Sequence, residues 1–147
     1  MSKQIFDVAG LADVQSVAVE LARLLKADAP RIVAFEGEMG AGKTTLIRSL
    51  VRALGADGSD GANSPSFAIA NDYGLTPDGM NVLHFDLYRL ESEAEAMDIG
   101  FEDYLDDPDN ICLVEWPDRA GELMPDELTL VRIELLPDHT RKVEIEY

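Results

Sequence analysis

One stretch, Gly37-Glu38-Met39-Gly40-Ala41-Gly42-Lys43-Thr44-Thr45, constrains the fold of this chain more than any other feature. It matches the pattern G-x-x-x-x-G-K-[ST], a loop whose glycines let backbone N–H groups approach a phosphate closely. Residues 32–35 before it form an apolar run typical of a buried strand, and residues 45–54 after it have the pattern of a helix that ends at Gly55. Strand, loop and helix in this order favour an α/β fold with a nucleotide phosphate site at the loop.

The loop also predicts roles for its own residues. We expect the phosphates to be held by the backbone and by the positive end of the following helix, through Met39, Gly40, Ala41, Gly42, Lys43, Thr44 and Thr45. The ammonium group of Lys43 is placed to reach the β- and γ-phosphates, and the hydroxyl of Thr44 to ligate Mg²⁺. A glycine-rich turn with an ordinary surface lysine is the simpler alternative, but it does not account for the flanking strand and helix.

Composition limits the partners and the compartment. The chain has 29 acidic and 12 basic residues and a formal net charge of −17, so strong direct binding of nucleic acid is not expected. A length of 147 residues fits one domain, residues 1–147. The one cysteine, Cys112, lies in an apolar run and is predicted to be core. Since no signal peptide or membrane span is visible and no internal disulfide can form, we expect a cytoplasmic protein.

Hydrophobic periodicity predicts the order of the elements. The expected helices are 11–25 and 45–54 with two short acidic pieces at 91–97 and 98–105, and the expected strands are 3–8, 31–36, 66–73, 80–88, 111–114, 131–135 and 143–147. Residues 76–79 have the composition of a type I turn, and 117–126 that of a loop. The sum is an α/β fold, a three-layer sandwich of the P-loop NTPase kind, whose mixed sheet is parallel at its centre and antiparallel at its edges.

Two acidic residues compete to be the carboxylate that such a loop needs for Mg²⁺ and for orienting water. Glu115 follows the four apolar residues 111–114, which is the pattern of a buried strand that delivers an acid to the carboxyl edge of a sheet. Asp86 follows 82–85, a similar but less apolar run. Each could instead be a strand-end carboxylate that bonds to a loop. The residues alone leave open which of the two positions the attacking water.

Other side chains that could bind a ligand or take part in catalysis are weaker candidates. His84 and His139 lack the clustered partners of a metal site, so we interpret both as structural or surface residues. Trp116 is either a core residue or, beside the acid that precedes it, a lid on the nucleotide pocket or a partner contact. Arg89 and Arg119 could neutralise transition-state charge, although an exposed, salt-bridged arginine is the ordinary case.

The segment that follows the helix at 45–54 has two interpretations. Residues 56–63 are too rich in glycine and aspartate for regular structure, and they lead into Ser64-Pro65-Ser66-Phe67. The segment is either a plain surface connection or a movable element near the γ-phosphate.

Four stretches together resemble the TsaE (YjeE) family, the ATPase component of bacterial tRNA threonylcarbamoyladenosine biosynthesis. They are the loop at 37–45, Ser64-Pro65-Ser66-Phe67, His84-Phe85-Asp86-Leu87-Tyr88-Arg89 and Glu115-Trp116-Pro117. The loop is generic, whereas the last two stretches are far more specific. Their order and spacing and the total length also agree, so the resemblance covers nearly the whole chain. In one departure, Ser66 stands where the family usually has threonine, and this substitution retains a hydroxyl group.

The resemblance implies ATP binding by residues 39–44, Mg²⁺ held by Thr44 and Glu115, and a functional acid at Asp86. It makes 64–67 a switch-like segment. It also implies two protein partners, TsaB and TsaD, which transfer a threonylcarbamoyl group to adenosine 37 of tRNA, while ATP hydrolysis supports repeated turnover. We expect hydrolysis to be slow without those partners, because no arginine-rich lid is evident.

Two other functions share the loop. A small-molecule or nucleoside kinase would need an acceptor pocket and several arginines around the transferred phosphate. The eight arginines here are scattered, which favours an ATPase. A nucleotide-binding adaptor that barely hydrolyses ATP is the third possibility.

Overall fold

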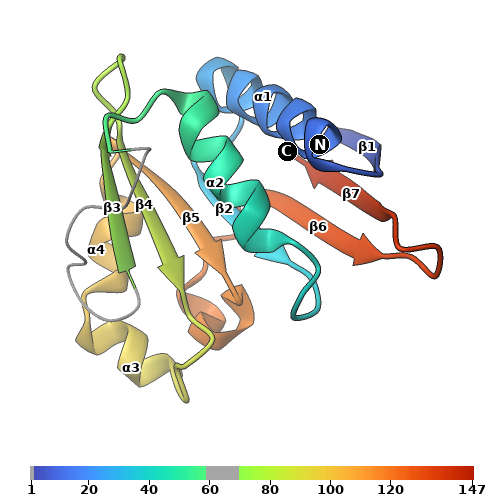
Figure 1. The fold of residues 1–147 in the computed structure, drawn as a ribbon. Helices are drawn as coiled ribbons and strands as arrows, with labels where there is room; N and C mark the ends of the chain where they lie inside the picture. The colour runs from blue at the N-terminus through green and yellow to red at the C-terminus, as the bar shows by residue number, and fades with distance from the viewer. Residues whose placement is uncertain (1, 59–69) are drawn as a thin grey trace.

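The structure is a computed structural model that describes residues 2–58 and 70–147. Figure 1 shows a mixed sheet with helices on both faces. The elements in chain order are β1 (Lys3–Val8), α1 (Leu11–Ala27), β2 (Ile32–Glu36), α2 (Lys43–Leu54), β3 (Ala70–Leu75), β4 (Asn81–Asp86), α3 (Glu93–Asp98), α4 (Phe101–Asp106), β5 (Asn110–Glu115), the 3₁₀ segment η1 (Pro117–Leu123), β6 (Thr129–Leu135) and β7 (Arg141–Glu146). In the part of the chain that the structure describes, no helix has both the length and the apolarity needed to cross a bilayer.

The sheet has the predicted mixture of directions. Its strand order is β1-β7-β6-β2-β5-β4-β3. The central strands β6, β2, β5 and β4 are mutually parallel, whereas β1, β7 and β3 join at the two sides by antiparallel pairing. The carboxyl ends of β2, β4 and β5 therefore meet at one edge of the sheet, where ligands bind in folds of this class.

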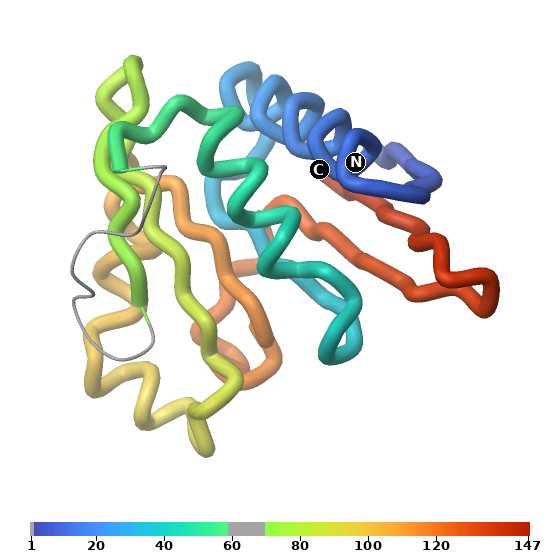
Figure 2. The backbone as a smooth tube through the Cα atoms, in the orientation of Figure 1, coloured from blue at the N-terminus to red at the C-terminus, as the bar shows by residue number. Residues whose placement is uncertain are grey.

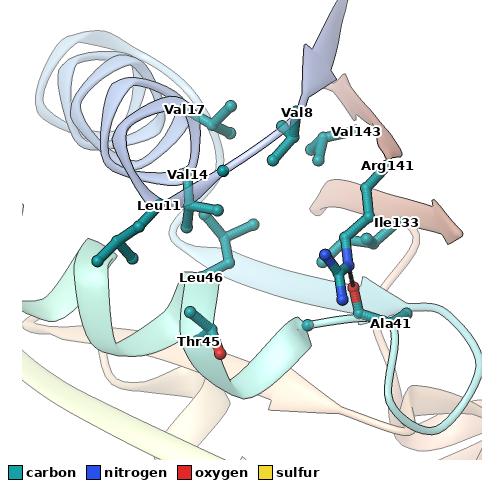
Figure 3. A pocket seen from close by; sticks show the side chains of 12 residues that line it. Val8, Leu11, Val14, Val17, Ala41, Thr45, Leu46, Ile133, Arg141 and Val143 are labelled. Atoms are coloured by element: carbon teal, nitrogen blue, oxygen red, sulfur yellow. Dashed lines mark hydrogen bonds between the residues drawn. The ribbon is translucent and has the colours of Figure 1, made fainter. Parts of the chain in front are cut away.

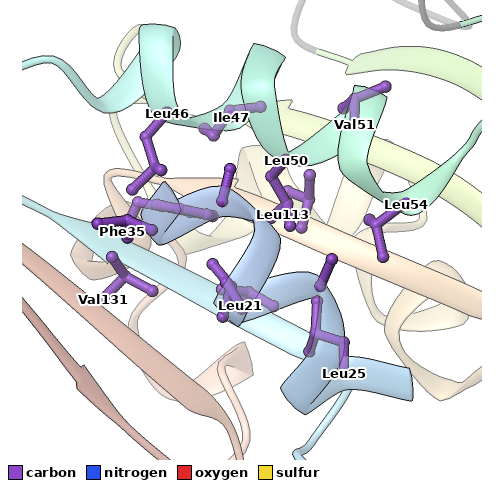
Figure 4. Packing of buried hydrophobic residues seen from close by; sticks show 14 of the residues in the cluster. Leu21, Leu25, Phe35, Leu46, Ile47, Leu50, Val51, Leu54, Leu113 and Val131 are labelled. Carbon is purple, nitrogen blue, oxygen red and sulfur yellow. The ribbon is translucent and has the colours of Figure 1, made fainter. Parts of the chain in front are cut away.

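Each face of the sheet has its own hydrophobic core. On one face, α1 and α2 pack over the inward residues of β2, β5 and β6, as Figure 4 shows for Phe35, Leu113 and Val131 beneath Leu46 and Leu50. The second core contains Phe85 and Val114 from the strands together with residues of α3, α4 and η1. Alternate residues of β2, β4 and β5 therefore enter different cores, which confirms the three-layer prediction.

Most predicted elements are present with shifted ends. The expected hairpin is formed by β3 and β4, although its first strand extends to Leu75, and residues 66–69 of the predicted strand lie outside the described residues. The helix after the loop begins at Lys43, two residues earlier than predicted. Residues 59–63 of the predicted loop and the stretch 64–67 are likewise outside the described part, so neither interpretation of that segment is tested.

One prediction was wrong. Residues 117–126 do not form a plain loop, because 117–123 wind into the 3₁₀ segment η1. Pro117 at its start has the backbone angle that a first helical turn requires, and the side chain of Ala120 is fully buried in the second core. A polar, turn-rich composition concealed this burial from the sequence pattern.

The tube in Figure 2 places both chain ends on the same side of the molecule, beside α1. Strands β1 and β7 pair along their whole lengths, and the backbone N–H of Ser2 donates to the carbonyl of Tyr147 over 2.7 Å. The C-terminal strand β7 is thus fixed between β1 and β6, which matters because its first residue, Arg141, points at the phosphate loop.

Candidate nucleotide site

The loop between β2 and α2 exposes the start of α2 to any anion that enters. Gly42 is the N-cap residue of α2 and has a φ of 105°, a left-handed conformation that favours glycine. Among the described residues, no side chain caps α2, and its first turn contains no acidic residue. The first backbone N–H groups of α2 and the positive end of its dipole are therefore available to a phosphate.

The shape of the loop is fixed by contacts with β6 and β7. A Cβ atom at Gly37 would lie 2.8 Å from the carbonyl oxygen of Ile133, so only glycine allows the loop to lie this close to β6. On the other side, Nε of Arg141 donates to the carbonyl oxygen of Ala41 over 2.6 Å. Sequence reasoning missed Arg141, because it lies a hundred positions from its partner in an ordinary alternating strand and belongs to no motif.

Lys43 lies in the cleft above this loop. Its Nζ donates to the carbonyl oxygen of Gly37 over 2.6 Å and lies 3.6 Å from the centroid of the Trp116 ring. Burial lowers the pKa of Lys43, and the nearby carboxylates of Glu115, Asp86 and Asp118 partly oppose this shift. A cation so placed can neutralise phosphate charge that arrives in the cleft.

Trp116 lines the cleft and also packs against the second core. Its φ of 56° is a left-handed conformation that is rare for a bulky side chain and costs roughly 1–3 kcal/mol. This conformation at the end of β5 holds the indole ring against Lys43 and beside the ring of Tyr88, with 5.2 Å between ring centroids. The strained turn is therefore a local feature of the cleft, and of the settings predicted for Trp116 the structure shows both a place beside the cleft and packing against a core.

The structure brings both predicted carboxylates to the cleft, but they differ in burial and in hydrogen-bond partners. Glu115 and Asp86 are register partners on β5 and β4. Glu115 is buried, and its Oε1 lies 3.3 Å from the hydroxyl oxygen of Thr44. Asp86 is exposed and accepts a hydrogen bond from the backbone N–H of Tyr88 over 3.2 Å.

The hydroxyl of Thr44 and the carboxylate of Glu115 fit a magnesium ion. Adjacent ligands of an octahedral Mg²⁺ at about 2.1 Å lie about 3 Å apart, close to the observed separation of 3.3 Å. The ion prefers one or two carboxylates together with phosphate oxygens and water, so these two groups would form the protein side of its coordination shell.

His84 was predicted to be either a structural or a surface residue, and the structure shows that it is not at the surface. It is buried, and its Nε2 lies 2.7 Å from Oε2 of Glu115. His139 is in the β6–β7 turn with a φ of 69° and is exposed. Arg89 is also exposed, and Arg119 donates to the carbonyl of Leu90 over 3.0 Å.

The phosphate loop, the two carboxylates, Trp116 and Arg141 line one open cleft of about 390 Å³, whereas the two histidines, Arg89 and Arg119 do not. Its lining consists of Met39, Gly40, Gly42, Lys43, Thr44, Thr45, Asp86, Tyr88, Glu115, Trp116 and Arg141. Every residue predicted for the site lines this cleft except Ala41, a buried residue of the loop that lines the neighbouring apolar cavity instead. The volume is within the range of small-ligand sites.

Figure 3 shows an apolar cavity of about 220 Å³ that shares lining residues with the cleft. Val8, Leu11, Val14, Ile133 and Val143 supply its aliphatic walls from β1, α1, β6 and β7. Gly42, Thr45 and Arg141 line both the cavity and the cleft. The cavity and the cleft therefore lie next to each other.

The family model and the similar proteins found by comparison are all described as TsaE. The family model described as "Threonylcarbamoyl adenosine biosynthesis protein TsaE" matches residues 8–143. Similar proteins, each described as tRNA threonylcarbamoyladenosine biosynthesis protein TsaE, include one from Haemophilus influenzae, 35% identical over 78% of this chain and 68% of its own length, and one from Streptomyces coelicolor, 40% identical over 80% and 74%. The relative from Aquifex aeolicus is 32% identical over 90% of this chain and 88% of its own length.

A solved structure shares the fold. The crystal structure of Bacillus subtilis YdiB superposes with a TM-score of 0.74 over 98% of this chain and 84% of that one, at 23% sequence identity.

Proposed function

Because the chain belongs to the TsaE family and hence to tRNA threonylcarbamoyladenosine biosynthesis, we propose that it binds ATP with Mg²⁺ and hydrolyses it in that pathway. One observation carries this proposal: the cation of Lys43, the uncapped start of α2 and the paired oxygens of Thr44 and Glu115 all face one cleft. Each of the three suits a different part of a magnesium-bound triphosphate.

The phosphates would be held by the loop backbone and Lys43, and Mg²⁺ by Thr44 and Glu115. When bound, the ion neutralises negative charge on the β- and γ-phosphates. Lys43 already lies in the cleft, where it hydrogen-bonds to the loop and contacts Trp116, so little side-chain ordering is needed when phosphate binds.

We place the nucleoside in the apolar cavity. The cavity shares Gly42, Thr45 and Arg141 with the lining of the cleft. Its aliphatic lining provides surface for a purine ring but few polar groups that would read its edge, so the triphosphate would contribute more specificity than the base.

For hydrolysis, we assign the two carboxylates different tasks. Both oxygens of Glu115 are engaged, one near Thr44 and the other at His84, which suits a fixed ligand. Asp86 is exposed at the cleft, and among the described residues only its Oδ1 accepts a hydrogen bond, from the backbone N–H of Tyr88, so it is the better group to orient an attacking water.

Turnover would depend on partners. Among the described residues, Arg141 is the only arginine that lines the cleft, and it is bonded to the loop carbonyl of Ala41. Arg119 is bonded to the backbone at Leu90. A further positive charge supplied by a partner would accelerate hydrolysis, as a cation at the transferred phosphate does in other P-loop enzymes.

The partners that we propose are TsaB and TsaD, in the cytoplasm, with the nucleotide state of this subunit controlling its association with them. A net charge of −17 opposes tight binding of tRNA by this chain alone, which suits a subunit that acts on proteins. Tight binding of tRNA by the isolated chain at physiological salt would contradict this part of the proposal.

The direct test is copurification with TsaB and TsaD in the presence of ATP, ADP or no nucleotide, with Lys43→Ala as the comparison. We expect the wild-type association to depend on the nucleotide, and Lys43→Ala to weaken ATP binding and remove that dependence. Unchanged ATP affinity in the variant would place Lys43 outside the site.

Labelled ATP separates this function from the kinase alternative. Incubation with candidate small-molecule acceptors should release free phosphate and label no acceptor, and the rate should rise when TsaB and TsaD are added. Transfer of the label to an acceptor would support a kinase instead, and no phosphate release with both partners present would support an adaptor.

A further inference from the structure

His84 is a polar side chain in an apolar place. It lies in the middle of β4 between Leu83 and Phe85, which enter the opposite core, and only 5% of its surface is exposed. Its Nε2 lies 2.7 Å from Oε2 of Glu115, which is 4% exposed. Two nearly buried groups therefore form one short hydrogen bond directly beneath the cleft.

The direction of this hydrogen bond follows from the chemistry of its partners. An ionised carboxylate can only accept, so Nε2 of His84 must carry the proton and donate to Glu115. The other ring nitrogen, Nδ1, is buried without a hydrogen-bond partner among the described residues. An unpaired buried polar atom has a free-energy cost that an apolar side chain of similar size would avoid. An apolar side chain would fill this part of the core better than a histidine. The hydrogen bond from Nε2 to Glu115 does account for the histidine.

The geometry of Glu115 indicates that use. Fixing Oε2 fixes the plane of the carboxylate, and the other oxygen, Oε1, is then 3.3 Å from the hydroxyl of Thr44. Without the histidine, the carboxylate could rotate about its last bond, and repulsion from Asp86, its register partner on β4, would favour other orientations.

We propose that His84 is a positioning residue, which holds Glu115 by its Nε2 proton so that Oε1 is presented together with the Thr44 hydroxyl as a preformed pair of ligands for a divalent cation. This inference rests on the proposed nucleotide site. It follows the general rule that partners of a ligand side chain set its orientation and thereby the affinity for the metal.

Three substitutions distinguish positioning from packing. His84→Gln places an amide N–H near the position of Nε2 and can still donate to Glu115. His84→Asn reaches only to the position of Nδ1, and His84→Phe keeps the ring volume but cannot donate. His139→Asn, at the exposed histidine of the β6–β7 turn, is the matched control.

The measurement is the affinity of Mn²⁺ for the protein–ADP complex, by electron paramagnetic resonance, alongside the affinity for ADP in EDTA. We expect His84→Asn and His84→Phe to weaken Mn²⁺ binding by roughly 10-fold to 100-fold, with ADP affinity in EDTA changed by about twofold or less. His84→Gln and His139→Asn should bind Mn²⁺ within about threefold of wild type. Melting temperatures show which variants are folded.

Three results would overturn the inference: Mn²⁺ affinity unchanged in folded His84→Phe, no advantage of Gln over Asn, or an equal loss of metal-free ADP binding. If His84→Phe does not fold, the Gln and Asn pair decides the question. A wild-type protein that binds neither ADP nor Mn²⁺–ADP would overturn the proposed function and this inference together. If the wild-type protein binds both and the His84 variants bind Mn²⁺ with the same affinity, only the inference is overturned.

Discussion

Filling the apolar cavity beside the loop should separate the two halves of the nucleotide site. Val14 lies on α1, lines the cavity of about 220 Å³ and is only partly buried, so its side chain can be enlarged into that space. We expect Val14→Phe to occupy the volume assigned to the purine while leaving the phosphate loop, Lys43 and Glu115 in place.

The magnitude follows from the area that the purine would lose. A flat aromatic group buries roughly 150 Å² when fully enclosed. At about 25 cal/mol per Å² this corresponds to about 4 kcal/mol. Because the cavity is only partly enclosed, we take about half of that value, about 2 kcal/mol, which is roughly a 30-fold loss of ATP affinity.

Isothermal titration of ATP and of inorganic tripolyphosphate, both with Mg²⁺, is the assay. ATP affinity should fall by roughly 30-fold in Val14→Phe, whereas tripolyphosphate affinity should stay within about twofold of wild type because it needs no base pocket. Val19→Phe is the matched control, since Val19 is on the same helix with 62% of its surface exposed. A folded Val14→Phe protein that binds ATP normally, or that loses tripolyphosphate affinity equally, would refute the position of the nucleoside.

Three further predictions concern other parts of the molecule. Arg141→Lys keeps the positive charge but loses the guanidinium hydrogen bond to the carbonyl of Ala41, so isothermal titration should show ATP affinity reduced by roughly 10-fold. An ATP affinity equal to that of wild type would contradict a role of this hydrogen bond in holding the loop. Gly37→Ala should destabilise the fold by roughly 1–3 kcal/mol in urea unfolding, because its Cβ would lie 2.8 Å from the carbonyl of Ile133; Gly10→Ala, with open space around its Cβ, is the control. Burial, with a smaller effect of a nearby acid, raises the pKa of the Cys112 thiol from 9.0 to about 12. The thiol therefore ionises first in the unfolded state, and Cys112 should contribute a fall of up to about 1.4 kcal/mol per pH unit to the unfolding free energy between pH 9 and 12, so this pH dependence should be shallower by up to that amount in Cys112→Val.

The sequence predicted the loop, its flanking strand and helix, and the layering of the sheet, because these depend on short-range rules. Glycine conformations, apolar runs and alternating faces act within a few residues of one another. The 3₁₀ turn at 117–123 was missed for the complementary reason: it is stabilised by burial of Ala120 against elements far away in the chain.

The candidate site divides in the same way. Both Glu115 and Asp86 could be named from strand-end patterns, but their separate roles depend on the register of β4 with β5 and on which carboxylate reaches Thr44. No local pattern contains the contact of His84 with Glu115 or that of Arg141 with the loop carbonyl.

By itself, the sequence therefore determined where the proposed phosphate site lies, since backbone N–H groups and a lysine within one short loop make up that site. Only the tertiary structure decided which distant side chains complete the site and how they are oriented. Such contacts are set by strand order and register. These bring His84 to Glu115, 31 positions away in the sequence, and Arg141 to Ala41, 100 positions away.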